Sequence, residues 1–206
     1  MTQTQDAYKK IVSAYTEANQ ERGAIMADLL RFIAKLPANG RVLDIGCGPG
    51  FDTAVLRQHN FRAIGVDLSW EMLHSGQSPY PAPRVQANML QLPFAKVDGV
   101  WACASLLHLP RTAMPAALQE IARILHPGGL FYLSLKWGEG ESWSKTSYGY
   151  AAPRFFTYWT PETLDPLLTA AGFTFPRHPI PNPHPPWLVR FAYRQPITSK
   201  QQPVTS

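Results

Sequence analysis

The sequence is poor in cysteine and in charge, and it has no long apolar run. Only two of its 206 residues are cysteines, Cys47 and Cys103, which excludes a disulfide framework and gives no spacing typical of a metal site. No window approaches about 18 uninterrupted apolar residues, so no membrane span is expected. The opening MTQTQDAYKK is too polar for a signal peptide. We therefore expect a globular, cytoplasmic protein with no metal and no membrane partner.

The charge balance is weakly positive. The 19 basic and 14 acidic residues leave a formal net charge of +5, and a positive surface can indicate a nucleic-acid partner. The basic residues are scattered, however, and only Lys9 and Lys10 are adjacent. No basic run is interleaved with aromatic residues as in a groove that binds single strands. A nucleic-acid partner is therefore not expected, and composition leaves the oligomeric state open.

Apolar segments of strand character alternate with segments of helical period through most of the chain. Strands are predicted at 41–46, 61–67, 84–88, 98–104 and 129–136, and helices at 51–59, 70–75, 112–125 and 161–171. Such alternation favours a parallel sheet with helices on both faces. Two more strands are predicted at 173–177 and 187–194. The chain is long enough for one domain, placed at 1–195.

Three segments lie outside this alternation. Residues 6–36 have a helical period with a break at Gly23, and we expect them to form a helical cap. Residues 137–160 hold eight aromatic residues without a regular period, which indicates either a satellite core or the wall of a substrate pocket. A proline-rich loop at 179–186 and a disordered polar tail at 196–206 complete the predicted organisation.

The nine residues VLDIGCGPG, which end at Gly50, are the most informative of the chain. An apolar strand ends in Asp44 and breaks into a turn with Gly46, Gly48 and Gly50. A glycine turn between a strand and a helix lets backbone N–H groups approach a ligand. A dinucleotide fingerprint would need its third glycine at position 51, which is Phe51.

This motif closely resembles the first motif of the class I S-adenosylmethionine-dependent methyltransferases. Asp67 ends the next strand in IGVDLS, seventeen residues after Gly50, where an acid can accept hydrogen bonds from both hydroxyls of a ribose. A helix N-cap at Asp67 or Ser69 is the alternative. The resemblance implies an α/β, Rossmann-like fold with a doubly wound, mostly parallel seven-stranded sheet and an antiparallel last strand. It implies S-adenosylmethionine as cofactor, its cationic amino-acid end held with help from Asp44.

The resemblance covers residues 6–195 and extends to three later motifs. ANMLQLPF follows the third strand and has Asn88 where the family usually has an acid that accepts from the adenine amino group; an amide oxygen can also accept. Met89 would then cover the adenine, unless it packs in the core. HPGG, after Leu125, matches the family's turn into the fifth strand. The implied cofactor-binding residues are Asp44, Gly46, Cys47, Gly48, Gly50, Asp67, Leu68, Asn88, Met89 and Cys103.

The exit loop of the fourth strand carries the candidate catalytic residue, His108. Ligands of doubly wound sheets lie at the carboxyl ends of the strands, and a base assists methyl transfer to a hydroxyl or a protonated amine. The alternative is a histidine that caps a turn. We predict that the acceptor contacts Tyr8, Tyr15, Trp137 and Phe155, with the two tyrosines forming a lid unless they pack in the core.

The function predicted from the sequence is methyl transfer from S-adenosylmethionine to a small molecule by in-line displacement, as in the type 11-like branch of the family. One alternative is methylation of a modified base in transfer RNA, and another is a non-catalytic S-adenosylmethionine-binding module. Cys103 lacks the Pro-Cys context of a nucleophile for base methylation. The acceptor and its methylated atom stay open at this point.

Overall fold

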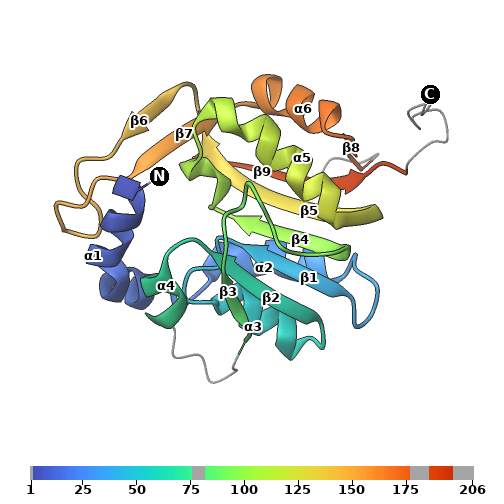
Figure 1. Cartoon of the computed structure of the whole chain (residues 1–206), viewed down its shortest axis with the longest axis horizontal. Helices are drawn as coiled ribbons and strands as arrows, with labels where there is room; N and C mark the ends of the chain where they lie inside the picture. The colour runs from blue at the N-terminus through green and yellow to red at the C-terminus, as the bar shows by residue number, and fades with distance from the viewer. Residues whose placement is uncertain (1, 76–81, 177–185, 197–206) are drawn as a thin grey trace.

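The computed structural model describes residues 2–75, 82–176 and 186–196 (Figure 1). The predicted proline-rich loop and polar tail, apart from residues 186 and 196, lie outside these ranges. In the described ranges the chain forms a twisted sheet with helices on both faces, which confirms the predicted fold class. No helix in this part of the chain has both the length and the apolarity needed to cross a membrane.

Five parallel strands form the body of the sheet, in the order β3-β2-β1-β4-β5. Their bounds are β1 Arg41–Ile45, β2 Arg62–Asp67, β3 Arg84–Gln86, β4 Val97–Cys103 and β5 Leu125–Trp137. Ile45 of β1 pairs with Val66 of β2. Because these strands run in parallel and in register, the loops that follow β1, β2 and β4 meet at one edge of the sheet.

Strand β9 (Trp187–Arg194) pairs antiparallel with β5 and with the short β8 (Phe173–Thr174), which gives the expected antiparallel last strand. The aromatic insertion contains two strands that the sequence did not predict, β6 (Glu141–Trp143) and β7 (Phe155–Trp159). They pair antiparallel with each other, and β7 joins β5 through two register pairs only. Because β6 and β7 form few strand pairs, and with residues distant in sequence, residues 137–160 show no regular hydrophobic period from which these strands could be predicted.

Six α-helices accompany the sheet, at Thr2–Asn19 (α1), Gly23–Ile33 (α2), Phe51–Gln58 (α3), Trp70–Ser75 (α4), Met114–Ile124 (α5) and Pro161–Ala170 (α6). Short 3₁₀ turns lie at Leu106–His108 (η1) and Arg111–Ala113 (η2). Helices α5 and α6 pack on one face of the sheet, and α2 and α3 pack on the other. Figure 1 shows α1 apart from both layers, beside the carboxyl ends of the parallel strands.

Two cores follow from the alternation of side chains along the strands. Leu43 and Ile45 of β1 pack toward α5, whereas Val42, which precedes Leu43, packs toward α2 and α3. The predicted break at Gly23 separates α1 from α2. The two cores therefore hold the strands from both faces of the sheet, and α1 lies over their carboxyl ends.

Candidate active site

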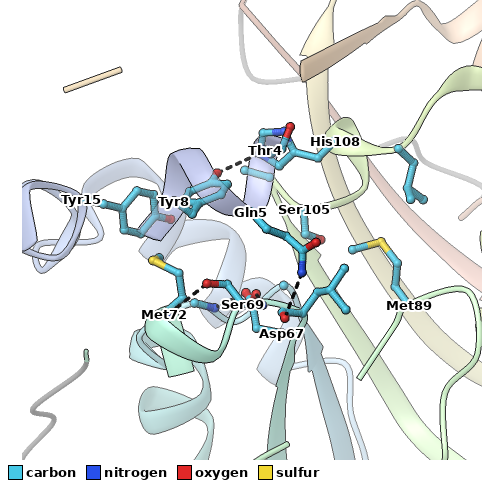
Figure 2. A pocket seen from close by; sticks show the side chains of 15 residues that line it. Thr4, Gln5, Tyr8, Tyr15, Asp67, Ser69, Met72, Met89, Ser105 and His108 are labelled. Atoms are coloured by element: carbon cyan, nitrogen blue, oxygen red, sulfur yellow. Dashed lines mark hydrogen bonds between the residues drawn. The ribbon is translucent and has the colours of Figure 1, made fainter. Parts of the chain in front are cut away.

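The ends of β1, β2 and β4 and the first turns of α1 enclose a cavity, which we call the strand-end cavity. Its volume is about 100 Å³. It brings together eight of the residues predicted from the sequence. They are Tyr8, Tyr15, Gly46, Gly48, Asp67, Leu68, Met89 and His108. Figure 2 shows the two tyrosines above Asp67 and Met72, with Tyr8 hydrogen-bonded to His108.

Asp67 is held in place by backbone groups. Its carboxylate accepts hydrogen bonds from the backbone N–H of Gly48 at 2.9 Å and of Ser69 at 2.8 Å. Burial raises the pKa of Asp67, and these N–H groups oppose that rise. Ser69 accepts from the N–H of Met72 at 3.3 Å near the start of α4. Ser69 thus takes the capping role, while Asp67 has oxygen lone pairs left for a ligand.

The glycine turn does not offer free N–H donors, which corrects the expectation from the sequence. The N–H groups of Gly46 and Cys47 both donate to the carbonyl of Val66, and that of Gly50 donates to the carbonyl of Cys47. The turn folds back on the end of β2, and the hydrogen bonds formed there and within the turn use these N–H groups. Gly46 and Gly48 have φ of 73° and 51°, so the turn provides a surface without Cβ atoms for a close approach.

Ser105 lies with His108 in the exit loop of β4 and is a further residue of the site. It is only 5% exposed and lines the strand-end cavity. Among the described residues its Oγ is the one buried side-chain polar atom without a hydrogen-bond partner, so this hydroxyl is available to a bound ligand. A Cβ at Gly46 would lie 2.2 Å from the Cβ of Ser105. Thr4 and Gln5 also line the cavity, although the helix was predicted to begin at residue 6.

Asp44, Cys47 and Cys103 line a smaller cavity that adjoins the first at Gly46 and Tyr15. The Asp44 carboxylate accepts from the Thr53 hydroxyl at 2.6 Å. Burial and the nearby Asp52 carboxylate raise the pKa of Asp44 well above its usual range. A cationic ligand group beside Asp44 would favour its ionised form. Burial also raises the pKa of Cys103 to about 12, so this thiol stays protonated and is a poor nucleophile.

Four of the predicted residues do not line these cavities. Gly50 precedes α3 with φ of 86°, and Asn88 accepts a hydrogen bond from the N–H of Leu90 at 3.0 Å. Trp137 is 37% exposed. Phe155 packs its ring on Trp143 and contributes its backbone carbonyl to the site.

The Phe155 carbonyl orients His108. It lies 2.6 Å from Nδ1, and because a carbonyl oxygen only accepts, Nδ1 carries a proton. Burial, with smaller contributions from the charges of Arg154 and Lys136, lowers the pKa of His108 to about 4, although the hydrogen bond to Phe155 opposes this shift. The ring is therefore neutral near pH 7, and its Nε2 accepts from the Tyr8 hydroxyl at 2.8 Å. Arg154 in turn donates to that hydroxyl at 3.1 Å.

This environment predicts a pH dependence of stability. The pKa of His108 falls from the ordinary 6.5 to about 4 on folding, so the unfolded chain binds a proton that the folded one does not. The stability that the neutral His108 ring contributes is fully present above pH 6.5 and is lost as the pH falls toward 4. We expect the free energy of unfolding in urea to decrease over this interval less in His108→Gln than in the wild type. Equal pH slopes would contradict the assignment.

A second cavity, which we call the aromatic cavity, adjoins the first at Tyr8, Tyr15, Ala104 and His108. Its volume is about 370 Å³, within the range of small-molecule sites. The aromatic side chains that complete its wall are Tyr132, Tyr148, Phe156 and Trp187. Both interpretations of the aromatic insertion hold for different residues, since Tyr148 and Phe156 line this cavity whereas Trp159 is buried in the main core.

A glycine turn after β1, an acid at the end of β2 and a cavity between them define a nucleoside-type ligand site of a doubly wound sheet. Comparison with known proteins specifies the family. Residues 43–133 match the model of a methyltransferase domain, which confirms the resemblance drawn from the sequence. The chain therefore contains a methyltransferase domain over residues 43–133.

Related proteins agree with this assignment. The chain is 37% identical over 127 residues to trans-aconitate 2-methyltransferase of Azoarcus sp. (strain BH72), with 59% of this chain and 48% of that protein covered. It shares its fold with a protein from Pyrococcus horikoshii OT3, at a TM-score of 0.73 and 17% identity, over 92% of this chain and 98% of the other.

A third similar structure carries ligands. It is 1,6-didemethyltoxoflavin-N1-methyltransferase of Burkholderia thailandensis with bound 1,6-didemethyltoxoflavin and S-adenosylhomocysteine, at a TM-score of 0.63 and 24% identity over 93% of this chain and 88% of the other. The chain spans about half, or less, of the length of the curated relatives it matches.

Proposed function

We propose that this protein transfers a methyl group from S-adenosylmethionine to a small-molecule acceptor. The strand-end cavity holds the methyl donor and the aromatic cavity holds the acceptor. The observation that carries this proposal is the junction of the two cavities at Tyr8, Tyr15, Ala104 and His108. Two reactants bound on either side of this junction are adjacent, as an in-line displacement requires.

The residues of the strand-end cavity fit the donor. Asp67 has free lone pairs for the ribose hydroxyls, and the unpartnered Ser105 hydroxyl supplies a further polar contact. Asp44 would accept the cationic amino-acid end through the adjoining cavity. Met89 lines the place for the adenine, with Asn88 next to it in the chain. When bound, the donor supplies a methyl group already activated by its positive sulfur.

The protein's own part is to align the reactants and exclude water. Helix α1 covers the strand-end cavity and is tied to the body of the domain on one side. Gln5 donates to the carbonyl of Leu68 at 3.3 Å, and Lys9 lies 3.3 Å from Glu71. On the other side Tyr8 is hydrogen-bonded to His108 and Arg154, and Thr4 accepts from the N–H of Phe155 at 3.1 Å, so α1 is held closed over the cavity.

Small-molecule acceptors of related enzymes support this choice of acceptor class. The names of two similar proteins specify trans-aconitate and 1,6-didemethyltoxoflavin. The aromatic cavity also favours an enzyme over a module that only binds the cofactor. A screen with a labelled methyl donor tests the proposal, with small molecules in one arm and unfractionated transfer RNA in the other. Label in RNA alone would favour the transfer-RNA alternative.

The ribose contact of Asp67 is tested by calorimetry. Asp67→Ala leaves two ribose hydroxyls unpaired and is expected to weaken S-adenosylhomocysteine binding by about 1–3 kcal/mol. Asp6→Ala, at an exposed acid of α1, is the matched control and is expected to bind normally. Thermal melts of both variants establish that they fold. Wild-type affinity in Asp67→Ala would refute the assignment.

A further inference from the structure

Two cations flank a single ring in the aromatic cavity. Lys136 Nζ lies 4.1 Å from the centroid of Phe156, and the Arg154 guanidinium carbon lies 5.1 Å from it. Both residues line the cavity. In the described part of the chain, no carboxylate lies within 4.0 Å of either one. Each interacts with the negative face of an aromatic ring instead.

The other charged residues of this cavity are already compensated. Arg22 forms a two-pronged ion pair with Asp52, with N···O distances of 2.6 and 2.7 Å. Asp28 accepts from Arg31 at 3.0 Å and from the Tyr132 hydroxyl at 3.1 Å. The cavity therefore has an excess of positive charge.

Protein contacts orient Arg154, but no carboxylate of the described residues compensates the charge of Lys136. Arg154 donates to the Ser147 hydroxyl at 2.9 Å and to Tyr8 at 3.1 Å, and neither acceptor is anionic. Lys136 lies near the end of β5, half-buried over the Phe156 ring. Two like charges on one ring repel each other, most strongly where water is excluded. An anion in the cavity that both side chains can reach would relieve this repulsion and gain two charge-assisted contacts.

We propose that the acceptor carries an anionic oxygen group, a carboxylate or a phosphate, that Lys136 and Arg154 hold in the aromatic cavity. This inference rests on the proposed function, because it specifies the acceptor class of the same site. The surrounding aromatic side chains, among them Tyr148 and Phe156, suit a flat apolar body attached to that group.

An anion at this place would also act on His108. The charges of Arg154 and Lys136 both contribute to the low pKa of that ring. A bound anion offsets them, so the pKa of His108 rises when the acceptor arrives. The ring then becomes a better proton acceptor at the moment when the proton has to leave.

Calorimetry with three simple probes tests the proposal on protein saturated with S-adenosylhomocysteine. Benzoate, phenyl phosphate and uncharged benzamide share one ring and differ in the group that it carries. At least one of the two anions is expected to bind about tenfold more tightly than benzamide. The preferred anion then identifies the group as carboxylate or phosphate. Its binding should also raise the pKa of His108, measured by nuclear magnetic resonance.

Variants then test whether Lys136 and Arg154 hold the anion. Lys136→Met is expected to weaken binding of the preferred anion about tenfold and to leave benzamide unchanged. Lys145→Met is the matched control, because Lys145 is an exposed lysine of the aromatic insertion that follows β5 and does not line the aromatic cavity. Arg154→Met should act like Lys136→Met, but it also removes a contact of Tyr8. The decision therefore rests on Lys136.

Three results would overturn the inference: no binding of any probe, equal binding of anions and benzamide, or unchanged anion binding in Lys136→Met. Binding of S-adenosylhomocysteine is measured first on the same samples. If that ligand binds and the anions show no preference, the inference about the acceptor fails and the proposed function stands. If that ligand does not bind, the proposed function fails, and titration of the ligand-free protein still tests the charge pair.

Discussion

Gly48→Val is expected to abolish S-adenosylhomocysteine binding in a chain that still folds. A Cβ at Gly48 would lie 3.1 Å from the Met72 methyl group and 3.8 Å from the Tyr15 ring, on the wall of the strand-end cavity. The two further methyl groups of valine have to occupy space that the ligand needs. A β-branched residue is also strained at φ of 51°, at a cost of about 1–2 kcal/mol in stability.

A matched variant separates blockage from strain. Gly172 follows α6 with φ of 86° and has no atom within 4 Å of an added Cβ. Gly172→Val therefore introduces similar backbone strain far from the cavity, and we expect it to bind the ligand normally. Calorimetry measures binding, and circular dichroism melts confirm folding. Retained affinity in Gly48→Val would mean that the turn only reverses the chain.

His108→Ala is expected to lower turnover about 100-fold or more and to leave affinity for S-adenosylhomocysteine unchanged. The neutral ring points Nε2 at the Tyr8 hydroxyl, and Tyr8 lines both cavities. A proton from the acceptor can then pass to Tyr8 as Tyr8 gives its own proton to Nε2. Turnover is measured with the acceptor that the labelled-donor screen identifies.

Tyr8→Phe distinguishes this relay from a base that acts directly. It keeps the ring contacts with Tyr15 and His108 and removes only the hydroxyl. If the two residues act as a unit, Tyr8→Phe loses most of the same factor and the double variant is no slower than His108→Ala. Wild-type turnover in His108→Ala would leave His108 a structural role and reduce catalysis to alignment.

The predictable part of this protein is encoded by residues that are close in sequence. The strand–glycine turn–helix unit around Gly46 and Gly48 and the acid at the end of the next strand depend on local backbone conformation and on strand polarity. Both are visible in short windows. The parallel sheet follows from the alternation of strand and helix patterns. The cavity position follows in turn, because parallel strands present their carboxyl ends at one edge.

Tertiary packing decided the rest of the site. Tyr8 and His108 are 100 residues apart, and Arg154 meets Tyr8 across 146 residues. No local pattern reports such contacts. Packing also decided that the N–H groups of Gly46 and Cys47 donate to Val66 and that Ser105 is left without a partner. It likewise decided that Trp137 lies outside the cavities although Phe156 lines one.

The sequence by itself thus determined the parallel part of the sheet, the glycine turn and the acid beside it, since local conformation and strand direction are properties of contiguous residues. Only the tertiary structure decided how α1 covers the cavity, which aromatic residues face the acceptor, and that Lys136 and Arg154 share one ring. The physical reason is that charge compensation and cavity shape depend on every element packed around a point, and those elements come from distant parts of the chain.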